Sequence, residues 1–213
     1  MRSKLCGLPA RRGAQIDDAP SRDVAQKIAK GPALPVRLIK RAVLQSYMIA
    51  GDNQNLYNIA KTEKNEDLKR EAIKQLGLVG GESELEQLYR SESSAIIRRE
   101  VLQAFFLAGD SKRLVEAAEG EKDLELRREA IKNLGLIDDK EAASALQKIY
   151  AKETDHGLKE EVLNAYFLQG NATALVAIAR SEKDSGLKKL AVEKLSLMDD
   201  KVATDYMMEL LQK

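Results

Sequence analysis

The chain has 213 residues, of which 32% are charged and 4% aromatic, and 35 Lys and Arg balance 34 Asp and Glu to a net charge of +1. This composition favours helices, and no apolar run approaches the roughly 18 residues that a membrane-spanning helix needs. The balanced charge argues against electrostatic binding of nucleic acid over the whole protein surface. The single cysteine, Cys6, excludes an internal disulfide framework.

Residues 1–20 show no hydrophobic periodicity, and we expect them to form a disordered tail. Basic residues near the N-terminus precede no apolar stretch, so the tail does not read as a signal peptide. Residues 21–30 place Val24 and Ile28 at helical spacing, which predicts a degenerate first helix. Its partner helix is expected to begin near Pro35, a residue tolerated in a first turn.

From there on, a unit of about 30 residues repeats along the chain. The sequence REAIKQLGL at 70–78 returns as REAIKNLGL at 128–136, and REVLQAFFLAGD at 99–110 returns as EEVLNAYFLQGN at 160–171. One anchor position per unit sets the register, and its spacing is constant except for one longer step between Ala130 and Val162. The anchors are Val43, Ala72, Val101, Ala130, Val162 and Ala191.

Each unit is predicted to contain two helices, A and then B, and no segment alternates as a half-buried strand does. A capping side chain marks the start of each later B helix, namely Asn65, Ser94, Asp123, Asp155 and Asp184. The A helices share a leucine column, namely Leu56, Leu85, Leu114, Leu146 and Leu175. Short linkers rich in Gly, Asp and Asn fit helix C-caps.

A short helix pair cannot bury its apolar face alone, but stacked pairs share one core. We therefore predict an all-α fold, a right-handed α-α superhelix (α-solenoid) of about six helix pairs, as one solenoid over residues 21–213. The units lie near 21–50, 53–79, 82–108, 111–137, 140–169 and 172–198, and residues 200–212 form a C-terminal capping helix.

The pattern D-x-x-L-[KR]-[KR]-E-A-I-x-x-L-G, as at residues 123–135, resembles the short HEAT-like repeats of the phycobilin-lyase type. The resemblance covers roughly residues 35–213 and extends to the C-terminal repeat arrays of bacterial HEAT-repeat proteins, which have an armadillo-like helical fold. It implies a superhelix whose B helices line the concave side. It implies no particular chemistry, because unrelated functions occupy this scaffold.

Charged residues recur around each anchor. Position −3 is basic in every unit and position −2 carries Arg41, Arg70, Arg99 and Arg128 in the first four units. Directly before the anchor, Glu71, Glu100, Glu129 and Glu161 form an acidic row. The simpler interpretation is a set of solvated ion-pair ladders. The functional alternative is a binding stripe made by Arg70, Lys74, Arg99, Gln103, Arg128 and Lys132.

Five residues after the anchor, large and small residues alternate. Met48, Phe106 and Phe167 occupy one kind of unit, and Gly77, Gly135 and Ser196 the other. The simpler interpretation is that each large ring packs over the glycine of the next unit. The alternative is an apolar groove that presents Phe106 and Phe167 to a partner.

Catalysis has little support, because the only histidine, His156, is expected to be exposed and no His/Cys cluster or phosphate loop is present. We therefore predict no enzyme, no metal and no cofactor, but a non-catalytic protein-interaction scaffold. Two alternatives stay open: a nucleic-acid-binding solenoid that uses the Arg/Lys ladder, which the charge disfavours, and a bilin lyase-like subunit.

The partner is expected to be a protein or peptide. We expect no membrane insertion, and we expect the chain to be a monomer. Localisation is left open: cytoplasmic for the chain as it stands, periplasmic or envelope-associated if it is part of a longer exported protein.

Overall fold

The computed structural model describes residues 35–212. The chain divides into two units, residues 1–39 and 40–213. The predicted tail at 1–20, Cys6 and the predicted helix at 21–30 lie outside the described residues. The first described helix, α2 (Val36–Ala50), begins in the first unit and ends in the second.

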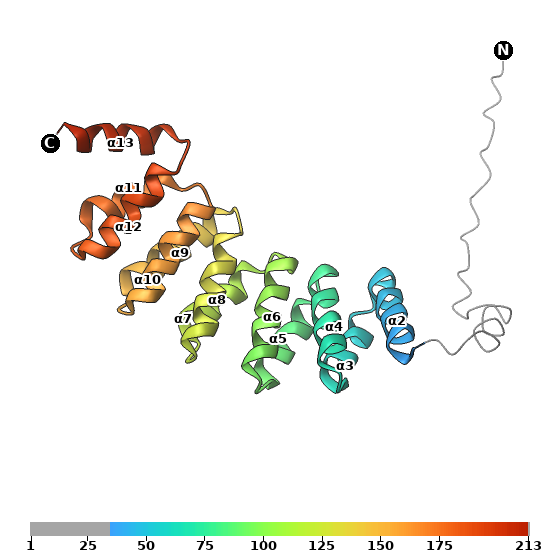
Figure 1. Ribbon diagram of the computed structural model, residues 1–213. Coiled ribbons are helices and arrows are strands. Elements are labelled where there is room, and N and C mark those ends of the chain that lie inside the picture. The colour runs from blue at the N-terminus through green and yellow to red at the C-terminus, as the bar shows by residue number, and fades with distance from the viewer. Residues whose placement is uncertain (1–34, 213) are drawn as a thin grey trace, which may run out of the picture. The chain divides into compact units, whose positions relative to one another are not determined.

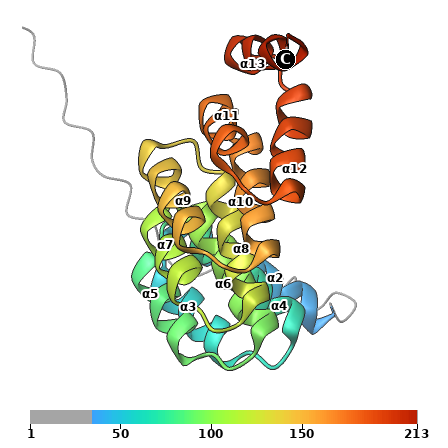
Figure 2. The same cartoon turned by 90° about the vertical axis from the view of Figure 1, so that its left-hand side faces the viewer.

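The described part of the chain contains twelve helices and no strand, which confirms the all-α α-solenoid (Figure 1). After α2 come α3 (Asn53–Thr62), α4 (Glu66–Leu78), α5 (Glu82–Ser91), α6 (Ala95–Ala108), α7 (Ser111–Gly120), α8 (Leu124–Gly135), α9 (Lys140–Lys152), α10 (His156–Leu168), α11 (Ala172–Ser181), α12 (Ser185–Ser196) and α13 (Lys201–Leu211). The even-numbered helices are the B helices and the odd-numbered ones the A helices. Within residues 40–213 they form two layers, which Figure 2 separates for α3 to α10.

Side-chain caps fix where the helices begin. All five predicted caps accept a hydrogen bond from the backbone N–H three residues later, as Asn65 does from Leu68 and Asp184 from Leu187. The A helices use the same device, for example Asp110 for α7 and Asn171 for α11. Each cap accepts a hydrogen bond from an otherwise unpaired N–H of a first turn. The Asn, Ser and Asp residues between the apolar segments therefore determine where the helices begin.

The core runs between the two layers. The predicted A-helix column Leu56, Leu85, Leu114, Leu146 and Leu175 is fully buried, and the B-helix leucines Leu68, Leu126, Leu158 and Leu187 are 2% exposed or less. Units therefore bury their apolar faces against one another, as a solenoid requires.

Neighbouring units join in two alternating ways. Gly77 in α4 lies against the backbone of Ala104 in α6, and Gly135 in α8 lies against that of Ala165 in α10. At these tight junctions the A helices also pack directly, α3 on α5 and α7 on α9. The atoms nearest to Gly77 belong to the Ala104 backbone, so the contact that requires glycine is a backbone approach. The packing of a large side chain over the glycine of the next unit stays a prediction.

The other junctions are wider in the A layer, between α5 and α7 and between α9 and α11. A tyrosine occupies each of them, Tyr89 in α5 and Tyr150 in α9, where the other A helices carry Ala60, Ala118 and Ala179. The Tyr89 hydroxyl donates to Glu121 at 2.8 Å and the Tyr150 hydroxyl to Glu182 at 2.6 Å. The architectural repeat is therefore a pair of units, with a tight junction inside it and a wide one at its end.

We predict that Gly135→Ala destabilises the fold by roughly 1–3 kcal/mol, because the new Cβ would lie 2.6 Å from the Cα of Ala165 and two helix backbones would have to separate. Gly120→Ala is the matched control, since a Cβ there meets nothing within 4 Å. It should be neutral or stabilise by up to about 1 kcal/mol. Urea unfolding followed by circular dichroism measures both, and equal effects of the two substitutions would contradict the backbone-contact account.

Candidate functional site

The predicted binding residues lie on four consecutive B helices. Lys74, Arg99, Gln103 and Lys132 are exposed, whereas Arg70, Arg128, Phe106 and Phe167 are half-buried. Both phenylalanine rings pack against the core, and the Nζ of Lys194 lies 5.1 Å from the centroid of the Phe167 ring. Four of the six polar members are therefore more exposed than the aromatic ones.

Four of the six basic side chains at position −3 form inter-unit ion pairs. Lys40 binds Glu63 and Lys69 binds Glu92, each at 2.6 Å, while Arg98 pairs with Glu121 and Arg127 with Glu153. Each of these carboxylates follows the last residue of an A helix, and Glu182 takes the equivalent place after α11. We call these five residues the C-cap glutamates.

The second oxygen of each C-cap glutamate accepts backbone N–H groups from the A–B linker. Glu153, for example, accepts from Thr154 at 2.8 Å and from Asp155 at 2.9 Å. One carboxylate thus holds the linker of its own unit and, in the four ion pairs, a basic side chain of the unit before. The side chains of Glu121 and Glu153 are 8% and 7% exposed, so these ion pairs lie largely out of solvent. The position −3 row therefore serves the junctions rather than a partner.

These contacts lower the pKa of all five C-cap glutamates. For Glu63 the hydrogen bond from Lys40 is the main cause. Burial works against ionisation of Glu121, but hydrogen bonds from Tyr89 and from two backbone N–H groups, with the nearby Arg98 charge, outweigh it and leave the pKa below its ordinary value. The pKa values of Glu92, Glu153 and Glu182 are shifted in the same direction.

The position −2 row is only partly neutralised. Arg70 lies 3.5 Å from Glu66 and 3.6 Å from Glu100, and Arg128 lies 2.6 Å from Glu125. Arg99 has no ion pair within residues 35–212. The same holds for Lys74 and Lys132, four residues further along their helices than Arg70 and Arg128. Positive charge that no carboxylate neutralises is therefore present on α4, α6 and α8.

Sequence reasoning missed an exposed apolar row. Position +6, which lies at the end of each B helix or directly after it, carries a large aliphatic residue in every unit, and all six are exposed, from 38% at Leu107 to 76% at Ile49. We call this set the leucine row: Ile49, Leu78, Leu107, Leu136, Leu168 and Leu197. Its signal in the sequence is its constant register with the anchors. Helical periodicity alone places it on the same face as the polar positions −2 and +2.

The remaining candidate features of the described residues are the histidine, metal-binding groups and membrane spans. His156 is exposed, as predicted, with its ring nitrogens 3.2 Å from Glu160 and 3.3 Å from Asp184. Within residues 35–212 no group of three or more His, Cys, Asp or Glu could hold a metal ion. None of the helices in this range has the length and apolarity of a membrane span.

The fold and its repeating two-helix units define an α-solenoid. The family model of HEAT repeats matches residues 83–166, which span the range from α5 into α10. Over this range the chain is similar to HEAT repeats, which agrees with the resemblance to HEAT-like repeats noted in the sequence. No curated protein sequence matches the chain.

The C-cap glutamates make the stability depend on pH. Their pKa values in the folded state lie below the ordinary value of 4.5, so they stabilise the fold above that pH, and the stabilisation is lost as the pH falls through the lower folded values. We predict that Glu121→Gln with Glu153→Gln costs about 1 kcal/mol or more per site at pH 7. The difference from the unsubstituted protein should shrink below pH 4.5.

Glu119→Gln, at an exposed position in α7, is the control and should change little at either pH. Urea unfolding at pH 7 and at pH 3.5 measures the difference. A double variant that loses as much stability at pH 3.5 as at pH 7 would show that the carboxylate charge is not what joins the units.

Proposed function

We propose that the protein is a non-catalytic protein-binding scaffold and that the exposed face of its B helices binds an acidic amphipathic segment of a partner. HEAT repeats are in general protein-interaction scaffolds. The observation that carries the proposal is the leucine row lying beside Lys74, Arg99 and Lys132, three cations that no carboxylate of the described residues neutralises. An exposed apolar row with a polar margin is typical of an interaction site.

The spacing of the rows favours a helical partner. Positions −2, +2 and +6 lie four residues apart, or about 6 Å along each B helix. Neighbouring packed helices lie about 8–10 Å apart. A partner helix laid across the B helices advances about 10.5 Å in seven residues, so a heptad of apolar residues would meet successive members of the leucine row. Acidic residues on its flank would meet the position −2 and +2 cations.

The two rival functions have less support. Affinity for a nucleic-acid backbone depends on the number of phosphates that Lys and Arg neutralise, but Glu66, Glu100 and Glu125 already pair with part of the arginine row. A bilin lyase-like role would depend on Cys6, which lies outside the described residues, or on His156, which is held between carboxylates.

We predict that Arg99→Glu with Arg128→Glu weakens partner binding by more than about 1.5 kcal/mol, because two cations become like charges against an acidic segment. The partner is recovered by a photo-crosslinker placed at position 132, and its affinity is measured by calorimetry. Lys112→Glu with Lys148→Glu, at exposed sites of α7 and α9, is the matched control and should change the affinity much less. Equal affinities for the two double variants would move the binding surface away from the B helices.

We also predict that Leu107→Ser with Leu136→Ser lowers the affinity at least about tenfold, or about 1.4 kcal/mol, because a partner would bury less apolar area. Leu211→Ser is the control, since Leu211 is 81% exposed in α13 but does not belong to the leucine row. Unchanged binding by the Leu107 and Leu136 variant would leave charge alone as the basis of recognition and remove the amphipathic requirement.

A further inference from the structure

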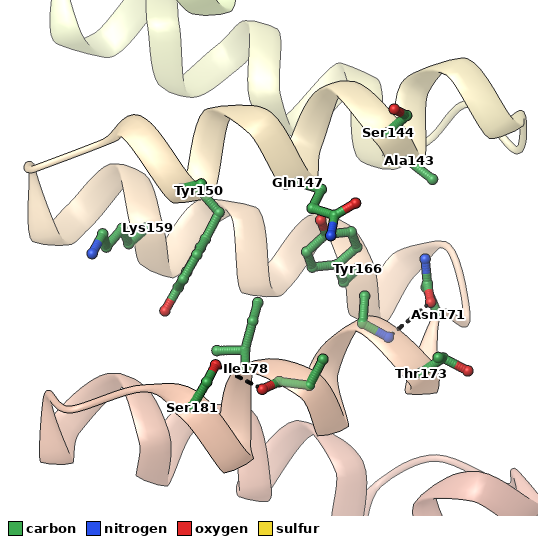
Figure 3. Close-up of a pocket in the computed structure, with 13 residues that line it drawn as sticks. Ala143, Ser144, Gln147, Tyr150, Lys159, Tyr166, Asn171, Thr173, Ile178 and Ser181 are labelled. Carbon is green, nitrogen blue, oxygen red and sulfur yellow. Dashed lines mark hydrogen bonds between the residues drawn. The ribbon is translucent and has the colours of Figure 1, made fainter.

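A cleft of about 690 Å³ opens in the A layer, between α9 and α11 and over α10 (Figure 3). Tyr150 and Gln147 reach into it from α9, Ile178 from α11, and Tyr166 of α10 lies between them. Four alanines, at positions 143, 151, 174 and 177, line the two wall helices. The cleft thus lies at the second of the two wide junctions.

The first wide junction, between α5 and α7, provides an internal comparison, because the repeat aligns it position for position with the second. There Glu86 pairs with Arg113, which also binds Glu116 at 3.0 Å, and Glu86 further binds Arg90. An ion-pair cluster therefore spans that junction. Where Glu86, Arg113, Glu116 and Arg90 stand, the second junction carries Gln147, Ala174, Ala177 and Ala151. Because the charged side chains are replaced by small or neutral ones, the space between α9 and α11 remains open.

A tyrosine hydroxyl distinguishes the second junction further. Tyr166 stands where the first junction has Phe105, and it is 1% exposed. Its hydroxyl has no hydrogen-bond partner within residues 35–212. Burial raises the pKa of Tyr166 to about 12, so the hydroxyl stays protonated near pH 7. Because Tyr166 lines the cleft, a bound group can reach its hydroxyl and gain a hydrogen bond there.

The lining is almost free of net charge. Lys159 is the single charged residue among the described residues that line the cleft, and its Nζ lies 5.2 Å from the centroid of the Tyr150 ring. Lys159 is also close enough to Glu182 to help lower the pKa of that carboxyl, after the hydrogen bonds from Tyr150 and the Asp184 backbone. The rest of the lining carries no charge. An uncharged occupant matches such walls better than an ionic one.

The polar groups of the lining are distributed along the walls. Thr173 and Ser181 lie near opposite ends of α11, about 12 Å apart along the helix axis, and Ser144 and Gln147 lie on α9. An extended peptide covers that length with about four residues and presents a backbone donor and acceptor at each one. A distributed polar lining around an apolar centre suits such a chain.

We propose that the α9–α11 cleft binds an uncharged peptide segment, which inserts an apolar side chain between the alanine-lined walls and hydrogen-bonds to the Tyr166 hydroxyl. This site lies in the A layer, so it goes beyond the proposed B-helix surface and does not depend on it. The chemistry of the two ligands also differs, uncharged here and acidic there.

The test is a selection of random dodecapeptides displayed on phage against the full chain, with counter-selection on a filled variant. Gln147→Glu with Ala174→Arg copies the Glu86–Arg113 pair of the first junction and fills the cleft. We expect enriched peptides with an uncharged apolar motif that bind the unsubstituted chain one to one, with affinity at least tenfold lower for the filled variant. Tyr166→Phe, which copies Phe105, should lower the affinity about threefold to tenfold.

Circular dichroism checks that each variant keeps its helices, and Tyr166→Phe carries the test if the filled variant does not fold. Arg99→Glu with Arg128→Glu should leave peptide binding unchanged, so failure of the B-helix proposal would not be mistaken for failure of this one. The inference is overturned if no selected peptide discriminates against either cleft variant, or if the selected peptides are acidic or basic.

Discussion

The C-cap glutamate is the interaction on which the rest of the structure depends. A helix pair of this length exposes a full apolar face, so each unit is stable only when it is joined to its neighbours. The glutamate accomplishes this with one side chain: one oxygen orders the A–B linker, and in four of the five the other accepts a cation from the unit before. Because the side chains of Glu121 and Glu153 are largely buried, solvent and salt screen these pairs less than they screen surface pairs.

The junctions between neighbouring units are of two kinds, and the size of the residue at position +5 of the B helix accounts for the difference between them. Where a B helix carries glycine at position +5, the next B helix approaches to backbone contact and the A helices close up as well. Where it carries phenylalanine, the A helices remain apart, and a tyrosine bridges them to a C-cap glutamate. Units with glycine and units with phenylalanine at position +5 thus form two kinds of junction. At the wide junction between α9 and α11 the space between the A helices forms a cleft.

Much of the fold could be predicted from the sequence because it depends on local chemistry. The capping residues, the leucine columns and the anchor spacing are all set within one helix or one turn, and the structure confirms them. The pairing of Arg98 with Glu121 could not be predicted in the same way, because it joins residues 23 positions apart and crosses between layers. The neighbours of Gly135 likewise depend on a helix-to-helix distance that periodicity does not contain. The candidate site shows the same division: periodicity placed Arg99 and Lys132 on one face, but the leucine row was recognised only once its exposure was known.

A comparison of equivalent positions at the two wide junctions shows which side chains can be replaced at little cost in stability. At the first, Arg113 and Glu86 lie about a quarter exposed, and pairs in such positions contribute only about 0–1 kcal/mol. Replacing them by Ala174 and Gln147 at the second junction therefore costs little, provided that the bridge from Tyr150 to Glu182 is retained, as it is. Tyr166 is a further difference, since its hydroxyl adds to the cleft a polar group that Phe105 lacks at the first junction. That hydroxyl makes no hydrogen bond within the described residues, and the proposed peptide would supply its partner.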